Sequence, residues 1–126
     1  MEEKFYDVLV MDDDVDIQQM IQSILTYYNY SVRTSSSLSV TNHLLRTTTP
    51  SMILMDMLLS GADGREICRL LKGQDDTKHI PIVMISAHPD AEVTCKAAGA
   101  DDFLAKPFDI DDLLGKIRKH LTVAGG

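Results

Sequence analysis

The sequence lacks any apolar stretch close to the roughly 20 residues that a membrane-spanning helix needs. Its first residues, Met1 to Lys4, also lack the basic start and long apolar core of a secretory signal peptide. We therefore expect a protein that is not inserted into a membrane and that resides in the cytoplasm.

Cysteine is scarce, with only Cys68 and Cys95 in the chain. Neither belongs to a C-x-x-C pair or to a Cys/His cluster with the spacing of metal ligands. We expect both to be small, buried apolar residues, as free cysteines in a reducing compartment usually are.

An excess of positive charge is also absent: the chain has 12 Lys and Arg residues and 19 Asp and Glu residues, which give a net charge of -7. This balance argues against binding to a nucleic-acid backbone as the main task. At 126 residues and 44% hydrophobic content, the chain has room for one core. We therefore expect residues 1–126 to form a single domain.

Strand-like runs alternate with helical patterns along the chain. The expected strands are Phe5 to Met11, Tyr30 to Thr34, Met52 to Asp56, Ile80 to Ser86 and Asp101 to Ala105. Apolar residues recur at helical spacing between them, including Val15, Ile17 and Met20, and Pro50 is expected just before the third strand. Right-handed crossovers then give an α/β fold, a flavodoxin-like (βα)5 doubly wound parallel sheet.

Carboxylates gather at two of the expected strand ends. Asp12, Asp13 and Asp14 follow the first strand, and Asp56 ends the third. With strand order 2-1-3-4-5, these two strands flank the point where ligands bind in open α/β sheets. Crowded carboxylates repel one another, so the pattern predicts a site for a divalent cation such as Mg²⁺ or Mn²⁺. Asp14 is expected to start a helix instead.

The other two strand ends carry groups that suit an acyl phosphate. Ser86 ends the fourth strand, and its hydroxyl can donate a hydrogen bond to a phosphoryl oxygen, with small Ala87 leaving the pocket open. Lys106 follows the fifth strand and can pair with the carboxylates or with a phosphoryl group. Pro107 comes next, and a cis peptide there would aim the lysine inward.

Together these motifs resemble the receiver domain of two-component response regulators, over the whole chain. The matching motifs, in order, are Asp12-Asp13, Asp-x-x-x-x-Gly-x-Asp-Gly from Asp56 to Gly64, Ser86-Ala87 and Lys106-Pro107-Phe108. The resemblance implies a phosphorylation-dependent signalling module rather than an enzyme that turns over a metabolite. It also implies a sensor histidine kinase or a histidine phosphotransfer protein as partner, and a downstream protein or output domain that the sequence does not identify.

The resemblance assigns roles to individual residues. Asp56 would accept the phosphoryl group, and Mg²⁺ would bind to Asp12, Asp13, Asp56 and the backbone carbonyl of Leu58. Ser86 and Phe103 would form the conformational switch, although Phe103 lacks the hydroxyl of the tyrosine often found there. Leu58 and His88 would influence the phosphoryl lifetime. Ser86 and Lys106 lie 20 positions apart, about two fewer than in familiar members, which predicts a short fourth crossover.

Two other functions compete with this interpretation. A pseudo-receiver would bind partners without being phosphorylated, and a haloacid-dehalogenase-type phosphatase would use Asp12 as its nucleophile. The complete set of pocket residues argues against the first. The second requires a further acidic pair after the lysine, whereas Asp101 and Asp102 precede it.

The remaining charged residues have ordinary expected roles. Asp101 and Asp102 are expected at a solvated strand start or a subunit contact, where Asp102 and Lys116 could pair across a weak homodimer. The histidines are expected on the surface or on helices without a catalytic role: His43, His79, His88 and His120.

Overall fold

A parallel five-stranded sheet forms the centre of the computed structural model, which describes residues 5–59 and 61–125, with side chains up to residue 121. Residues 1–4, 60 and 126 of the expected domain lie outside the described residues. The strand order is β2-β1-β3-β6-β7, which is the predicted order 2-1-3-4-5. The strands are β1 (Phe5–Met11), β2 (Val32–Ser35), β3 (Thr49–Asp56), β6 (Ile82–Ser86) and β7 (Asp102–Ala105).

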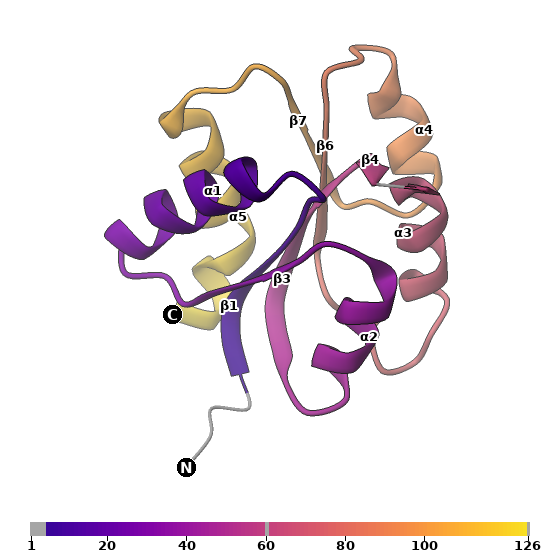
Figure 1. Cartoon of the computed structure of the whole chain (residues 1–126), viewed down its shortest axis with the longest axis horizontal. Helices are drawn as coiled ribbons and strands as arrows, with labels where there is room; N and C mark the ends of the chain where they lie inside the picture. The colour runs from indigo at the N-terminus through magenta and orange to yellow at the C-terminus, as the bar shows by residue number, and fades with distance from the viewer. Residues whose placement is uncertain (1–4, 60, 126) are drawn as a thin grey trace.

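Helices cover both faces of this sheet (Figure 1). One face carries α1 (Val15–Tyr27) and α5 (Ile110–Gly125), and the other carries α2 (Leu38–Leu45), α3 (Gly64–Lys72) and α4 (Ala91–Ala97). Each face has its own apolar core, because side chains alternate across a strand. None of the described helices combines the length and apolar character that a membrane crossing requires. The predicted doubly wound α/β fold is confirmed.

The strand boundaries differ in places from those expected. β3 begins at Thr49, so Pro50 lies inside the strand rather than before it. Pro50 stands opposite Tyr6 of β1, whereas the pairing of β3 with β6 begins only at Ile53. A residue without an N–H group is tolerated there because β3 has a single partner strand at that level.

The two cysteines lie in the core between the sheet and helices α3 and α4. Cys68 and Cys95 are both fully buried and unpaired, as expected. Burial raises the pKa of the Cys68 thiol to about 11 and also raises that of Cys95. Both therefore behave as small apolar side chains.

A short antiparallel pair follows β3, and the sequence pattern did not predict it. It joins β4 (Leu58–Leu59) to β5 (Ala62–Asp63) and leads directly into α3. At the start of α3, a Cβ atom on Gly64 would lie 2.5 Å from the backbone oxygen of Asp56. Only glycine allows this approach, which ties the start of α3 to the end of β3.

Candidate functional site

Four predicted residues come from four strand ends at one edge of the sheet. Asp12 follows β1, Asp56 ends β3, Ser86 ends β6 and Lys106 follows β7. Lys106 reaches Asp56 directly, with 2.8 Å between Nζ and Oδ2. The Lys106–Pro107 peptide bond is cis.

Asp56 is held by contacts to both of its carboxylate oxygens. Oδ2 accepts a hydrogen bond from Lys106, and Oδ1 accepts one from the backbone N–H of Leu58 at 3.0 Å. The residue is 8% exposed, so it is sheltered but open to a small reactant. Both contacts fix the orientation of the carboxylate at the end of β3.

Asp12 lies beside Asp56 and is 3% exposed. Burial is the main reason that the pKa of Asp12 rises from its ordinary 3.8 to about 6; the hydrogen bond from the Asp14 N–H lowers it in part, and the nearby Asp56 carboxylate raises it. Two neighbouring buried carboxylates form a site that a cation would stabilise, because its positive charge offsets their repulsion.

Asp13, the next residue along the chain, is exposed. Among the described residues, no three or more His, Cys, Asp or Glu side chains converge in a way that could hold a metal ion by themselves. The expected set of Asp12, Asp13 and Asp56 is therefore not gathered into such a group, and its metal-binding role stays a prediction. Mg²⁺ commonly uses only one or two protein carboxylates with several waters, so the pair of Asp12 and Asp56 fits this ion.

The predicted switch residues are both buried. The Ser86 hydroxyl is buried and accepts a hydrogen bond from the backbone N–H of His88 at 3.0 Å. Phe103 is 7% exposed and packs into the core shared with α3 and α4. Leu58 and His88 are both exposed.

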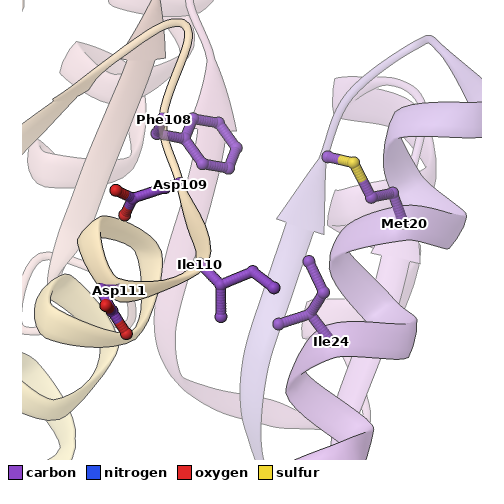
Figure 2. Close-up of a pocket in the computed structure, with 6 residues that line it drawn as sticks. All are labelled: Met20, Ile24, Phe108, Asp109, Ile110 and Asp111. Carbon is purple, nitrogen blue, oxygen red and sulfur yellow. The ribbon is translucent and has the colours of Figure 1, made fainter.

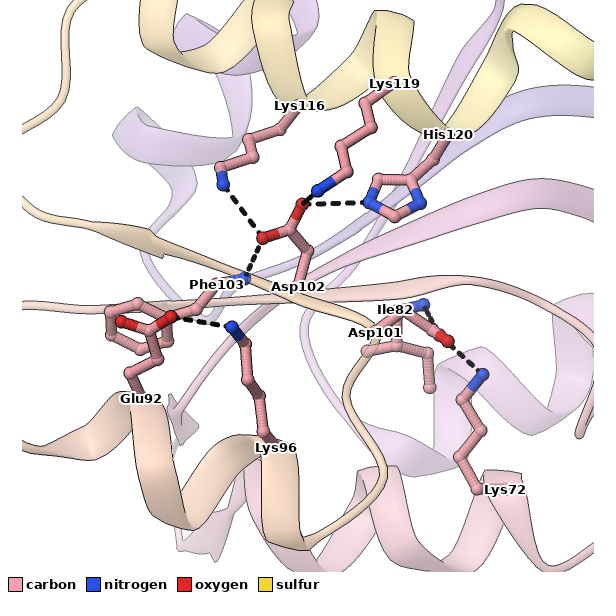
Figure 3. A network of polar contacts seen from close by, with 10 residues as sticks. All are labelled: Lys72, Ile82, Glu92, Lys96, Asp101, Asp102, Phe103, Lys116, Lys119 and His120. Carbon is pink, nitrogen blue, oxygen red and sulfur yellow. Dashed lines mark hydrogen bonds and ion pairs between the residues drawn. The ribbon is translucent and has the colours of Figure 1, made fainter.

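Asp102 corrects one of the expectations. It is 4% exposed rather than solvated, and its carboxylate faces three basic side chains of α5 (Figure 3): Lys116 at 2.8 Å, His120 at 3.0 Å and Lys119 at 3.2 Å. Burial alone would raise the pKa of Asp102, but hydrogen bonds from these side chains and from the Phe103 N–H hold it well below its ordinary value.

The pairing of Asp102 with Lys116 lies within one chain, and the expected contact between two copies stays a prediction. His120 lies on α5, as expected, and its ring contacts the Asp102 carboxylate. Asp101 anchors the start of β7, with its Oδ2 2.7 Å from Lys72 Nζ and 2.8 Å from the Ile82 backbone nitrogen. His43 and His79 are exposed, as expected.

An apolar groove beside the pocket was missed by sequence reasoning. It runs along α1 against the loop before α5 and the start of α5, where Met20 and Ile24 face Phe108 and Ile110 (Figure 2). Two acidic residues, Asp109 and Asp111, also line it. A cavity of about 610 Å³ occupies this stretch, and an adjoining one of about 370 Å³ reaches Lys106. Met20, part of the apolar repeat of its helix, is 43% exposed and points into this groove.

Comparisons with known proteins agree on one family. A sequence model described as the response regulator receiver domain matches residues 8–118. Response regulator MprA of Mycobacterium tuberculosis is 31% identical over 116 residues, which cover 90% of this chain and 50% of that protein. The chain spans about half the length of the curated relatives it matches.

Solved structures show the same fold. The receiver domain of NtrX from Brucella abortus has 31% identity and a TM-score of 0.84, with 92% of this chain and 98% of that chain covered. The chemotaxis protein CheY4 of Vibrio cholerae has 27% identity and a TM-score of 0.84, with 93% and 99% covered.

Proposed function

The chain belongs to the response regulator receiver domain family, and from this premise we propose that it accepts a phosphoryl group on Asp56 and signals through the resulting change in its surface. This is a regulatory family rather than a class of metabolic enzyme. The observation that carries the proposal is the placement of Asp56, which Lys106 and the Leu58 N–H hold at the end of β3, beside Asp12. We also propose that residues 1–126 form one receiver domain.

The proposed reaction is a transfer from a phosphohistidine to the Asp56 carboxylate. One carboxylate oxygen attacks phosphorus, the N–P bond breaks, and its electron pair returns to the imidazole nitrogen of the donor. Lys106 pairs with Asp56 before transfer and with a phosphoryl oxygen afterwards, so positive charge stays where negative charge develops. Mg²⁺ would be held by Asp12, Asp13, Asp56 and the backbone carbonyl of Leu58, and it would supply further positive charge at the phosphoryl position.

The switch follows from the new phosphoryl group. Ser86 turns its hydroxyl toward a phosphoryl oxygen and gives up its contact with the N–H of His88. The loop after β6 then moves toward Asp56, and Phe103 moves into the space that opens beneath it. Because Phe103 packs in the same core as α4, this movement changes the surface of α4.

Leu58 and His88 border the path of an attacking water. Leu58 is 59% exposed, so its side chain is free to cover the phosphoryl group from one side. We propose that it slows hydrolysis, and that His88 either screens or orients the water from the other side. The phosphoryl lifetime would then be set by side chains that do not touch Asp56.

The partner is a sensor histidine kinase or a histidine phosphotransfer protein, and the groove along α1 is the surface we propose for it. The groove reaches Lys106 at one end, so a helix lying in it would bring its own side chains next to the pocket. Exposed apolar residues on its walls, including Met20 and Ile110, supply the contact area.

The test is phosphorylation by a small donor. The protein is incubated with acetyl phosphate or phosphoramidate and Mg²⁺, and its intact mass is measured beside Asp56→Asn, Asp12→Asn and a metal-free sample. We expect an adduct of one phosphoryl group that requires Mg²⁺ and is absent in Asp56→Asn. No adduct would favour a phosphorylation-independent pseudo-receiver. An adduct that persists in Asp56→Asn and disappears in Asp12→Asn would favour the phosphatase alternative.

A further inference from the structure

Gln18, in the first half of α1, ties together the ends of two strands. Its side-chain amide donates hydrogen bonds to the backbone carbonyl of Asp12, just after β1, and to the backbone carbonyl of Ser35, at the end of β2. The second contact spans 3.3 Å. The side chain is half-buried between the helix and the sheet edge.

These contacts extend the sheet at the point where its own pairing ends. The register of β1 and β2 stops at Met11 and Ser35, and the N–H of Asp12 donates the last backbone bond, to Ser35, at 3.0 Å. Beyond this point the backbone at Asp12 has no strand beside it. The side-chain amide of Gln18 takes the place of a neighbouring strand and donates a hydrogen bond to the backbone carbonyl of Asp12.

Ser35 is a firm anchor for this arrangement. It is buried, and its hydroxyl accepts a hydrogen bond from Thr41 at 2.8 Å and donates one to the carbonyl of Ser37, at the start of α2. Gln18 therefore connects the acidic loop after β1 to a junction that α2 already fixes.

We propose that Gln18 is a positioning residue for the cation pocket, and this rests on the proposed function. Gln18 touches neither Asp56 nor the phosphoryl position. It holds the backbone at Asp12, and the direction of the Asp12 carboxylate depends on that backbone. Without the Gln18 amide, the Asp12 carboxylate samples more orientations. Binding of a cation must then restrict these orientations, which lowers the affinity for the cation.

A structural role alone would give a different result. If Gln18 only stabilised the fold, its loss would lower the free energy of unfolding and leave the affinity of the folded protein for Mg²⁺ unchanged. Gln19 is the matched control, because it lies next to Gln18 on the same helix and is exposed. The same substitution at both positions separates the contact from changes in helix propensity and charge.

The experiment measures the Mg²⁺ dissociation constant by calorimetry and stability by urea unfolding without metal. We expect Gln18→Met to weaken Mg²⁺ binding by about 10-fold or more, as is typical for residues that orient metal ligands, and Gln19→Met to bind like the wild type. If Gln18→Met does not fold, the shorter amide of Gln18→Asn replaces it. Equal dissociation constants for the Gln18 and Gln19 variants would overturn the proposal, whatever their stabilities.

A charge variant adds a test of sign. Gln18→Glu removes the donors and adds a negative charge near the pocket, and that charge alone would tighten cation binding. Weaker binding in Gln18→Glu, with equal or tighter binding in Gln19→Glu, supports positioning, and tighter binding in both contradicts it. A wild type that binds no Mg²⁺ would overturn both this inference and the proposed cation pocket. A wild type that binds Mg²⁺ and is phosphorylated on Asp56 keeps the proposed function, whatever the Gln18 variants do.

Discussion

Replacing Asp12 with asparagine should stabilise the protein while removing a proposed metal ligand. The Asp12 carboxylate is buried next to Asp56, and its pKa is raised from 3.8 to about 6. Asparagine keeps the side-chain oxygen that accepts the hydrogen bond from the Asp14 N–H, and it cannot carry a charge. The substitution therefore removes the repulsion and the burial of charge with little change in shape.

The magnitude follows from the pKa. A rise from 3.8 to about 6 corresponds to at most about 3 kcal/mol at neutral pH, at about 1.4 kcal/mol per pH unit. Solvent at the open rim screens part of this, so we expect Asp12→Asn to raise the free energy of unfolding by about 1 to 2 kcal/mol.

The sign of the pH dependence is also determined. Because the folded pKa lies above the unfolded one, Asp12 destabilises the fold progressively as the pH rises from 3.8 through about 6. The advantage of Asp12→Asn should therefore be largest above pH 7 and vanish below about pH 4.

Urea unfolding of both proteins in a chelator, across this pH range, measures the effect. Saturating Mg²⁺ should reduce the difference at neutral pH, because it stabilises the wild type more than the variant. An Asp12→Asn protein that is less stable than the wild type at neutral pH, or a gain that does not change with pH, would refute the reasoning.

Three further predictions test separate parts of the structure. Gly64→Ala should lower the free energy of unfolding by about 1 to 3 kcal/mol, because the new Cβ would lie 2.5 Å from the backbone oxygen of Asp56. Gly115→Ala, on an open face of α5, should instead stabilise by about 0.5 to 1 kcal/mol in urea unfolding; equal effects would contradict the close approach at Gly64. Asp102→Asn should lower the free energy of unfolding by about 2 to 4 kcal/mol at pH 7, because it leaves partly buried basic partners without their counter-charge. Lys119→Met should lower it by less than about 1 kcal/mol, because Lys119 is an exposed partner of Asp102. Because the pKa of Asp102 is lowered by folding, its contribution should fade as the pH falls below 3.8, and a pH-independent loss would show that packing dominates. Leu58→Asn should speed loss of the phosphoryl group measured by intact mass over time, and an unchanged rate would show that Leu58 does not shield it.

The sequence was sufficient to predict the sheet and the placement of the pocket residues at its edge. Short apolar runs at Val8 to Met11 and Met52 to Met55 indicate buried parallel strands, and polar residues directly after such strands must meet at one edge. The contact between Lys106 and Asp56 follows from that rule, although 50 positions separate them.

Contacts that depend on how α5 packs could not be predicted in this way. Asp102 was expected in solvent because a charged residue at a strand start usually is, yet three side chains of α5 gather around it. Their spacing in the sequence says which side of the helix they share, but not that this side lies over β7. The groove beside α1 was missed for a similar reason, since Met20 fits the apolar repeat of the helix but faces outward.

The reactivity of the two buried cysteines can be used to measure how often the helices that cover them separate from the sheet. Cys68 and Cys95 sit beneath α3 and α4, and their raised pKa values leave little thiolate at neutral pH. A thiol reagent can therefore react only when these helices lift from the sheet, so its rate counts those events. Labelling of the phosphorylated and unphosphorylated forms would then compare how often the α3 and α4 layer detaches in each state, without any added probe.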